Sequence, residues 1–135
     1  MLGVGAIILH RNRVLLVERG REPLKGYWSL PGGALETGER LEEGIRREVR
    51  EETGLEIRIV KVVEIFERIM RDRKGKAEYH YVLIDYLCRA SGGKLAASDD
   101  VARAEWVPRN ALSQYRITEG TLPVIEKAFR LRSKS

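Results

Sequence analysis

Three glutamates, Glu48, Glu51 and Glu52, close a helix-like stretch in the run GALETGERLEEGIRREVREETGL, residues 33–55. Their spacing of three and four residues places the carboxylates side by side on a helix surface. Their mutual repulsion is roughly 0.2–0.5 kcal/mol in water, but about 3 kcal/mol at ~6 Å with an effective dielectric constant near 20. The helix dipole is also negative at this end and favours cations. Because two local rules are broken together, the three acids indicate a functional site.

A helical wheel sets these acids apart from the neighbouring arginines. At 100° per residue from Glu48, the core residues Leu41, Ile45 and Val49 lie at roughly 20–100°, and Glu52 lies inside this arc at about 40°. The other side of the wheel, at roughly 160–280°, is expected to face water and carries Arg40, Arg46, Arg47 and Arg50. A hard divalent cation such as Mg²⁺, which takes oxygen ligands, is the simplest partner for the acids. A solvated ion pair with Arg47 remains the alternative for Glu51.

The elements that must position these acids can be predicted in outline. We expect the helix to run over residues 38–53, with Thr37 as N-cap, Glu39 in the first turn and Gly54 as the residue that ends it. The preceding Pro31, Gly32 and Gly33 form either a plain turn or a loop whose backbone comes close to a ligand.

Strands account for most of the remaining chain. Residues 2–9 and 14–18 predict one hairpin, and residues 56–69 and 77–90 predict a longer one. Residues 91–100 are expected to form a loop, followed by a short strand at 104–107, a helical turn near Asn110 and a final amphipathic helix. This order favours a mixed sheet covered by helices, in one domain over residues 1–135.

Composition restricts the kinds of partner. The net charge of +5 and the pI near 9.6 favour polyanions such as nucleotides, RNA or acidic lipids. No apolar run approaches the roughly 20 residues of a membrane span, and the N-terminus does not resemble a signal peptide. Cys88 is the only cysteine and is expected to pack in a strand, which excludes an internal disulfide. These observations predict a cytoplasmic protein without a membrane partner.

The run 33–55 resembles the signature box of the Nudix hydrolases: G, five residues, E, seven residues, R-E, an aliphatic, any residue, E-E, any residue, G, an aliphatic. Every fixed position of that pattern is present. The matching residues are Gly33, Glu39, Arg47, Glu48, Val49, Glu51, Glu52, Gly54 and Leu55.

The resemblance implies a fold, a reaction and a set of roles. The implied fold is α/β (α+β), an α/β/α sandwich around a mixed sheet, and the implied reaction is Mg²⁺- or Mn²⁺-dependent cleavage of a nucleoside diphosphate linked to another moiety. The implied metal ligands are the three acids and the carbonyl of Gly32. Arg47, which would orient the acids, is implied to support the box, together with Gly33, Glu39 and Gly54.

The remaining candidates surround this site. The proton acceptor is either Glu48 or an acid of the late loop, Asp100 ahead of Asp99, although both could merely form a turn. Arg19 and Arg21 could reach phosphates. Tyr27 or Trp28 could stack on a base, but Trp28 could equally belong to the core. His80 between tyrosines suits packing better than a site, and Trp106 is expected in the core.

We therefore expect an Mg²⁺-dependent pyrophosphohydrolase for ADP-ribose-like substrates or nucleoside diphosphate sugars. The alternatives are a (d)NTP pyrophosphatase that removes oxidised nucleotides and an enzyme acting on RNA 5′ ends. The net charge would suit RNA, but the basic run RIMRDRKGK is read more simply as a solvated hairpin turn. A nucleotide-binding module without activity is disfavoured because all the box acids are present. The chain is expected to be a monomer or a homodimer.

Overall fold

A computed structural model describes residues 1–98 and 100–132 of the chain. Seven strands form one mixed sheet with two α-helices and one 3₁₀ helix. In chain order the elements are β1 (Leu2–His10), β2 (Arg13–Arg19), β3 (Trp28–Ser29), β4 (Gly32–Ala34), α1 (Leu41–Thr53), β5 (Leu55–Arg71), β6 (Ala77–Gly93), β7 (Val101–Pro108), η1 (Arg109–Gln114) and α2 (Thr121–Arg132).

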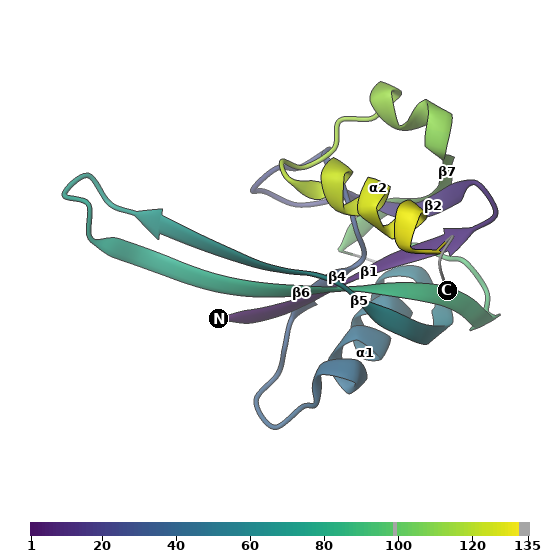
Figure 1. Ribbon diagram of the computed structural model, residues 1–135, viewed down its shortest axis with the longest axis horizontal. Coiled ribbons are helices and arrows are strands. Elements are labelled where there is room, and N and C mark those ends of the chain that lie inside the picture. Colours follow the sequence, from purple (N-terminus) through teal and green to yellow (C-terminus); the bar gives the residue numbers. More distant parts are fainter. Residues whose placement is uncertain (99, 133–135) are drawn as a thin grey trace.

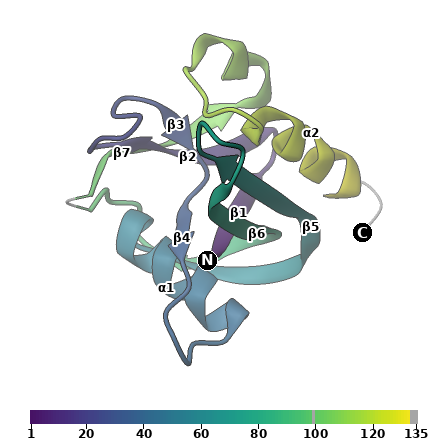
Figure 2. The same ribbon diagram turned by 90° about the vertical axis from the view of Figure 1, so that its left-hand side faces the viewer.

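The sheet follows the order β3-β2-β1-β6-β5, with β4 paired to β1 and β7 paired to β2. The β1–β6 pair is parallel, and the other paired strands are antiparallel. Figures 1 and 2 show α1 on one face of the sheet and α2 on the other. The expected mixed sheet between helical layers is therefore confirmed.

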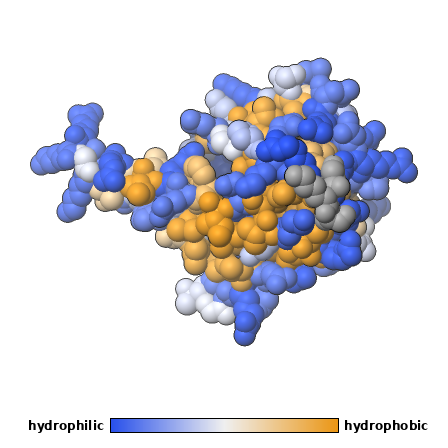
Figure 3. Space-filling model, viewed as in Figure 1, coloured by the Kyte–Doolittle hydropathy of each residue, from blue (hydrophilic) through white to orange (hydrophobic). Residues whose placement is uncertain are grey.

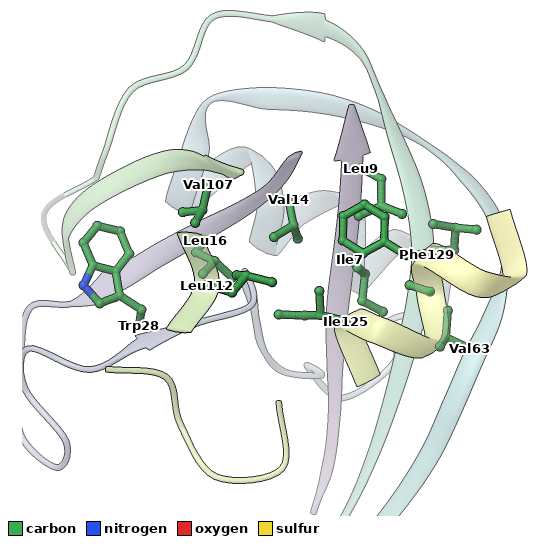
Figure 4. Packing of buried hydrophobic residues seen from close by; sticks show 12 residues of the cluster. Ile7, Leu9, Val14, Leu16, Trp28, Val63, Val107, Leu112, Ile125 and Phe129 are labelled. Atoms are coloured by element: carbon green, nitrogen blue, oxygen red, sulfur yellow. The ribbon is translucent and has the colours of Figure 1, made fainter. Parts of the chain in front are cut away.

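Strand β1 divides the core into two clusters because its side chains alternate between the faces. Ile7 and Leu9 belong to the cluster beneath α2, with Phe129 and Ile125 of that helix (Figure 4). Val4, Ala6 and Ile8 belong to the cluster beneath α1, with Ile45 and Val49. The helix stripe predicted from Ile45 and Val49 thus packs on the sheet and fixes the rotation of α1.

Helix α1 begins later than the sequence predicted. It starts at Leu41 after Arg40, which makes no capping side-chain hydrogen bond, so the predicted start at Gly38 and the Thr37 cap are wrong. Gly38 has a positive φ of 85°, and the Glu39 side chain accepts a hydrogen bond from Glu36 N–H, so both residues belong to the preceding loop. The predicted end is confirmed: Gly54 adopts the left-handed conformation at φ 76°.

The second half of the chain contains more strand than expected. Strand β6 continues to Gly93, and β7 begins at Val101 rather than at residue 104. The predicted loop at 91–100 is therefore too long, because Gly92 and Gly93 pair with the start of β5. The helical turn near Asn110 and the final helix are confirmed as η1 and α2. No helix in the described ranges is long and apolar enough to cross a membrane.

Candidate active site

The glycines before α1 allow the loop to lie directly on β1 and on the acids. A Cβ on Gly32 would lie 2.1 Å from the Val4 carbonyl oxygen, and one on Gly33 would lie 2.7 Å from the Glu48 carboxyl carbon. The backbone contact excludes a side chain at Gly32, and a side chain at Gly33 would displace the Glu48 carboxylate. The Pro-Gly-Gly run is therefore a close approach of backbone to a carboxylate rather than a plain turn.

Arg47 organises the acids from inside the box. Its guanidinium donates to both oxygens of Glu39, from Nε at 2.7 Å and Nη2 at 3.0 Å. Its Nη1 reaches Glu48 at 3.1 Å and Glu51 at 3.2 Å, and Nη2 also donates to the Ala34 carbonyl at 3.2 Å. These contacts lower the pKa of Glu39 and raise the pKa of Arg47.

This network corrects one step of the wheel argument. The wheel placed Arg47 on the water-facing side, but its side chain is only 20% exposed and turns back toward the acids. A helical wheel shows only where each residue leaves the helix axis. A long arginine side chain can bend from that position onto a neighbouring face of the helix. The expected role of Arg47 in orienting acids is consistent with these contacts, and the Arg47–Glu51 pair considered as an alternative also exists.

Glu52 lies in a different environment. Its Oε1 accepts a hydrogen bond from Gly32 N–H at 2.7 Å, and in the described part of the chain it makes no ion pair. Burial raises the pKa of Glu52 to about 7, an effect that the Gly32 hydrogen bond only partly offsets. Burial also raises the pKa of Glu48, although Arg47 opposes this shift. The negative charge of Glu52 is therefore the least compensated of the three.

The donor chemistry of this site fits a divalent cation. The candidate ligands are oxygens only, which suits Mg²⁺ or Mn²⁺, and a cation would favour the charged form that burial of Glu52 and Glu48 disfavours. Within residues 1–98 and 100–132, however, no three acid, His or Cys side chains converge closely enough to hold a metal. The carboxylates are turned to Arg47 and to Gly32 N–H instead. A cation held by all three acids would require Glu48 and Glu51 to turn away from Arg47.

A cleft of about 620 Å³ opens beside Glu52, between the sheet and the start of α2. Its wall contains one of the three acids, Glu52, together with Gly32 and Gly33. Residues 118–121, at and just before the start of α2, and Val124 also line the cleft. Glu48 and Glu51 do not line it, and Glu51 is 58% exposed.

Three residues predicted from other segments also line this cleft: Arg19, Arg21 and Asp100. Arg21 pairs with Asp100 at 3.2 Å, and both side chains are largely exposed. Arg19 donates to the Pro23 carbonyl at 2.9 Å, and its charge favours the ionised form of Glu52. The structure therefore brings these two arginines and Asp100 to the cleft, which Arg68, Glu22 and Glu119 also line. Asp99 lies outside the described residues.

Asp85 of β6 is a cleft residue that the sequence analysis missed. It lines the cleft, and in the described part of the chain it forms no hydrogen bond or ion pair. Burial, with a smaller contribution from Glu64, raises the pKa of Asp85 to about 6. A Cβ on its β1 neighbour Gly5 would lie 2.4 Å from Asp85 Oδ1, so glycine makes room for the carboxylate. The sequence did contain one sign of this site: Asp85 is the single acid inside the apolar run YVLIDYLC.

Other candidates lie outside the cleft. Trp28 is 6% exposed, packs edge-on against Tyr115 and belongs to the core beneath α2, so we remove it from the substrate-binding set. Tyr27 lies under the Arg116 guanidinium. His80 contacts Glu67 at 2.6 Å on the β5–β6 hairpin, away from the cleft. Trp106 packs against the core beneath α1, and Cys88 is buried, as expected.

A family model described as the NUDIX domain matches residues 1–128. The chain belongs to the Nudix hydrolase family. Nudix hydrolases generally use a divalent metal and act on small nucleotide substrates. The resemblance noted for residues 33–55 is therefore confirmed over nearly the whole chain.

Two curated Nudix relatives illustrate the range of activities. An "ADP-ribose pyrophosphatase" of Methanocaldococcus jannaschii is 37% identical over 111 residues, which cover 82% of this chain and 63% of the relative. An "8-oxo-dGDP phosphatase NUDT18" of Homo sapiens is 28% identical over 98% of this chain and 39% of the relative. The matches thus span less than two thirds of either relative.

Solved structures agree with the fold. A MutT NUDIX hydrolase from Burkholderia pseudomallei superposes with a TM-score of 0.79 at 29% identity, covering 93% of this chain and 95% of the other. The NUDIX domain of NrtR from Shewanella oneidensis, solved with ADP ribose, superposes with a TM-score of 0.76 at 26% identity, covering 98% and 88%.

Proposed function

We propose that this Nudix hydrolase is a pyrophosphohydrolase that needs Mg²⁺ or Mn²⁺ and cleaves the diphosphate of a nucleoside diphosphate linked to another moiety. ADP-ribose-like compounds and nucleoside diphosphate sugars are the preferred class. The observation that carries this proposal is Glu52: a buried carboxylate with a raised pKa, held by one backbone N–H, at the wall of a cleft that also contains three arginines.

The order of substrates is supported by the relatives and by the cleft. The relative named for ADP-ribose is 37% identical to this chain, compared with 28% for the relative named for 8-oxo-dGDP. The cleft of about 620 Å³ is also lined by Phe66, Leu83 and Asp85, so groups beyond the diphosphate would find apolar as well as polar contacts. Hydrolysis of (d)NTPs, including oxidised ones, is the second candidate because a "Nucleoside triphosphatase NudI" is also 33% identical.

The chain's own residues divide the work of phosphoryl transfer. Arg19 and Arg21 lie where they can bind phosphate oxygens, with Arg21 exchanging Asp100 for the substrate. Glu48, Glu51, Glu52 and the carbonyl of Gly32 would hold the cation, while Arg47 and Glu39 fix the box from behind. Bound there, Mg²⁺ would neutralise charge on the diphosphate and acidify the attacking water.

Two acids are candidates for accepting the proton of that water. Asp100 lies at the cleft and is tied only to the exposed Arg21, so substrate binding would release it. Glu48 is more buried and pairs with Arg47. We rank Asp100 first because a base must reach the reacting water. Asp100→Asn should then remove the acidic limb of the pH–rate profile, whereas Glu48→Gln should chiefly weaken metal affinity.

A substrate panel tests the proposal directly. ADP-ribose, nucleoside diphosphate sugars, (d)NTPs, 8-oxo-dGDP and triphosphorylated RNA are each incubated with Mg²⁺, with Mn²⁺ and with a chelator. We expect AMP and ribose 5-phosphate from ADP-ribose, with metal only and with the highest kcat/KM of the panel. A higher kcat/KM for (d)NTPs would replace the substrate class, and no metal-dependent product from any compound would overturn the function.

A further inference from the structure

The distal half of the β5–β6 hairpin projects from the body of the molecule as a two-stranded arm (Figure 1). Residues 68–71 of β5 pair only with residues 77–81 of β6, beyond the last residue of β6 that β1 reaches, Val82. Apolar side chains are exposed on the arm and at its base. They are Ile65, Phe66, Ile69, Met70, Tyr79 and Leu83, and Ile65 is 65% exposed. Figure 3 shows this apolar surface on the projection, behind a hydrophilic tip.

The arm leaves a backbone edge without a partner. In the described part of the chain β5 pairs with β6 alone and is the last strand of the sheet. A two-stranded ribbon is marginally stable on its own, and a long apolar edge strand is a template for another strand. Residues 64–70 of β5 pair with β6 in a continuous register without a bulge, so this edge is regular.

The charge order along this edge matches a second copy of itself. Two copies of a strand that pair antiparallel about a two-fold axis must place one residue opposite itself, with the rest matched symmetrically around it. The run EIFERIMR, residues 64–71, has Glu–Arg pairs four residues apart, centred on Phe66 and Ile69. Centring the axis on Glu67 or Arg68 instead would oppose like charges, which is unfavourable.

We propose that β5 of the arm pairs antiparallel with β5 of a second copy of this chain, with Ile69 on the two-fold axis. Glu67 then faces Arg71 of the partner subunit, twice by symmetry. The Phe66-centred register is disfavoured because it would place Lys61 opposite Arg71 of the partner subunit, two like charges. The product is a four-stranded ribbon, β6-β5-β5-β6.

This pairing would also affect the cleft. Phe66 and Arg68, which line the cleft, belong to the same strand. In this register Arg68 faces Met70 of the partner subunit. The second copy therefore contributes a side chain beside the cleft, while each cleft keeps its own acids.

Cross-linking tests the register. The full chain with Ile69→Cys should form a disulfide-linked dimer under mild oxidation, because residues opposite each other have Cβ atoms about 4.5–5.5 Å apart. Cys88 is buried and should not interfere. The matched control is Ile65→Cys. In this register the two copies of residue 65 are offset by about eight residues along the paired strands, or ~27 Å, which is too far for a disulfide. Equal cross-linking of both variants, or of neither, would overturn the register.

Sedimentation of the full chain tests the interface without new cysteines. We expect a dimer whose fraction rises between about 1 and 100 µM. Glu67→Arg and Arg71→Glu should each weaken dimerisation about tenfold, because symmetry turns one reversed charge into two repulsive contacts. The double swap should restore the dimer, whereas Glu78→Arg on the other arm strand should change nothing.

Two results would reject this interface. One is a wild-type chain that remains monomeric at about 100 µM, since the charged edge residues would then be acting against association. The other is a double swap that stays as weak as the single variants while its circular dichroism spectrum and melting temperature match wild type. Neither result depends on hydrolase activity, so the interface and the proposed function can fail separately.

Discussion

The two sides of the acid cluster at the end of α1 differ in how their charge is neutralised. On the side away from the cleft, one guanidinium, that of Arg47, donates hydrogen bonds to Glu39, Glu48 and Glu51. On the cleft side, Glu52 has one hydrogen bond from Gly32 N–H and a raised pKa. The chain therefore carries its own cation for the supporting acids and leaves the cleft-facing acid in need of one.

This difference explains why the arginine and the acids occur together in one short motif. Arg47 holds the loop and helix in register through Glu39 and the Ala34 carbonyl, which keeps Gly32 and Gly33 against the acids. A rigid support allows Glu52 to stay buried in an unfavourable charge state until a cation arrives. The contacts of Arg47 thus stabilise the fold, and this stability offsets the cost of burying the Glu52 carboxylate that would bind the cation.

Glu52→Gln should have the largest effect because it removes the cleft-side charge but can keep the acceptor for Gly32 N–H. We expect kcat/KM to fall by at least about 10³-fold, with the melting temperature unchanged or raised. Glu43→Gln, an exposed change on the same helix, is the control and should retain activity. Steady-state kinetics with the best substrate of the panel measure the effect; retained turnover in Glu52→Gln would remove Glu52 from the site.

Arg47→Lys should disrupt the hydrogen bonds by which Arg47 holds Glu39 and the Ala34 carbonyl. Lysine keeps the charge but cannot bind both oxygens of Glu39 and the Ala34 carbonyl at once. We expect the free energy of unfolding to fall by about 2 kcal/mol in urea. Arg46→Lys, at an exposed pair of 3.8 Å on the same helix, should change it by less than about 0.5 kcal/mol. Equal losses in the two variants would contradict a special role for Arg47.

The third expected effect is the pH dependence of stability without metal. The folded-state pKa of Glu52 is about 7, above its ordinary value of 4.5, so the folded protein binds more protons than the unfolded chain between these values. Stability should therefore fall as pH rises from 4.5 to 7, by up to roughly 2–3 kcal/mol. Asp85 adds a second fall, between its ordinary pKa of 3.8 and about 6.

Urea unfolding of wild type and Glu52→Gln in a chelator measures this dependence. The variant should lose less stability across the same pH range, because its amide does not titrate. Parallel curves for the two proteins would show that Glu52 does not carry the shift.

The sequence was informative where one residue type has one local consequence. Gly54 ends α1, the Ile45 and Val49 stripe packs on the sheet, and the clustered glutamates indicated a site before any family likeness was considered. These predictions need only chain geometry and charge. The start of α1 was predicted too early. Gly38 has a positive φ and Glu39 accepts a hydrogen bond from Glu36 N–H in the preceding loop, and helix propensity does not take such contacts into account.

The rest depended on tertiary contacts. Arg47 was assigned to the wrong face because its partner Glu39 lies in a loop outside the helix, beyond the reach of a wheel. Asp85 was missed because the space for its carboxylate is provided by Gly5 on a neighbouring strand, 80 residues earlier in the chain. Trp28 is in the core because Tyr115, from the far end of the chain, packs against it.

Calorimetric titration of Mg²⁺ and Mn²⁺ into wild type, Glu52→Gln and Glu43→Gln near pH 8 tests the central claim most directly. The claim is that Glu52 is left without a cation so that a divalent ion can bind. We predict saturable binding with proton release in wild type and Glu43→Gln, and at least about tenfold weaker binding in Glu52→Gln. Equal metal affinity in all three proteins, or no binding to folded wild type, would contradict it.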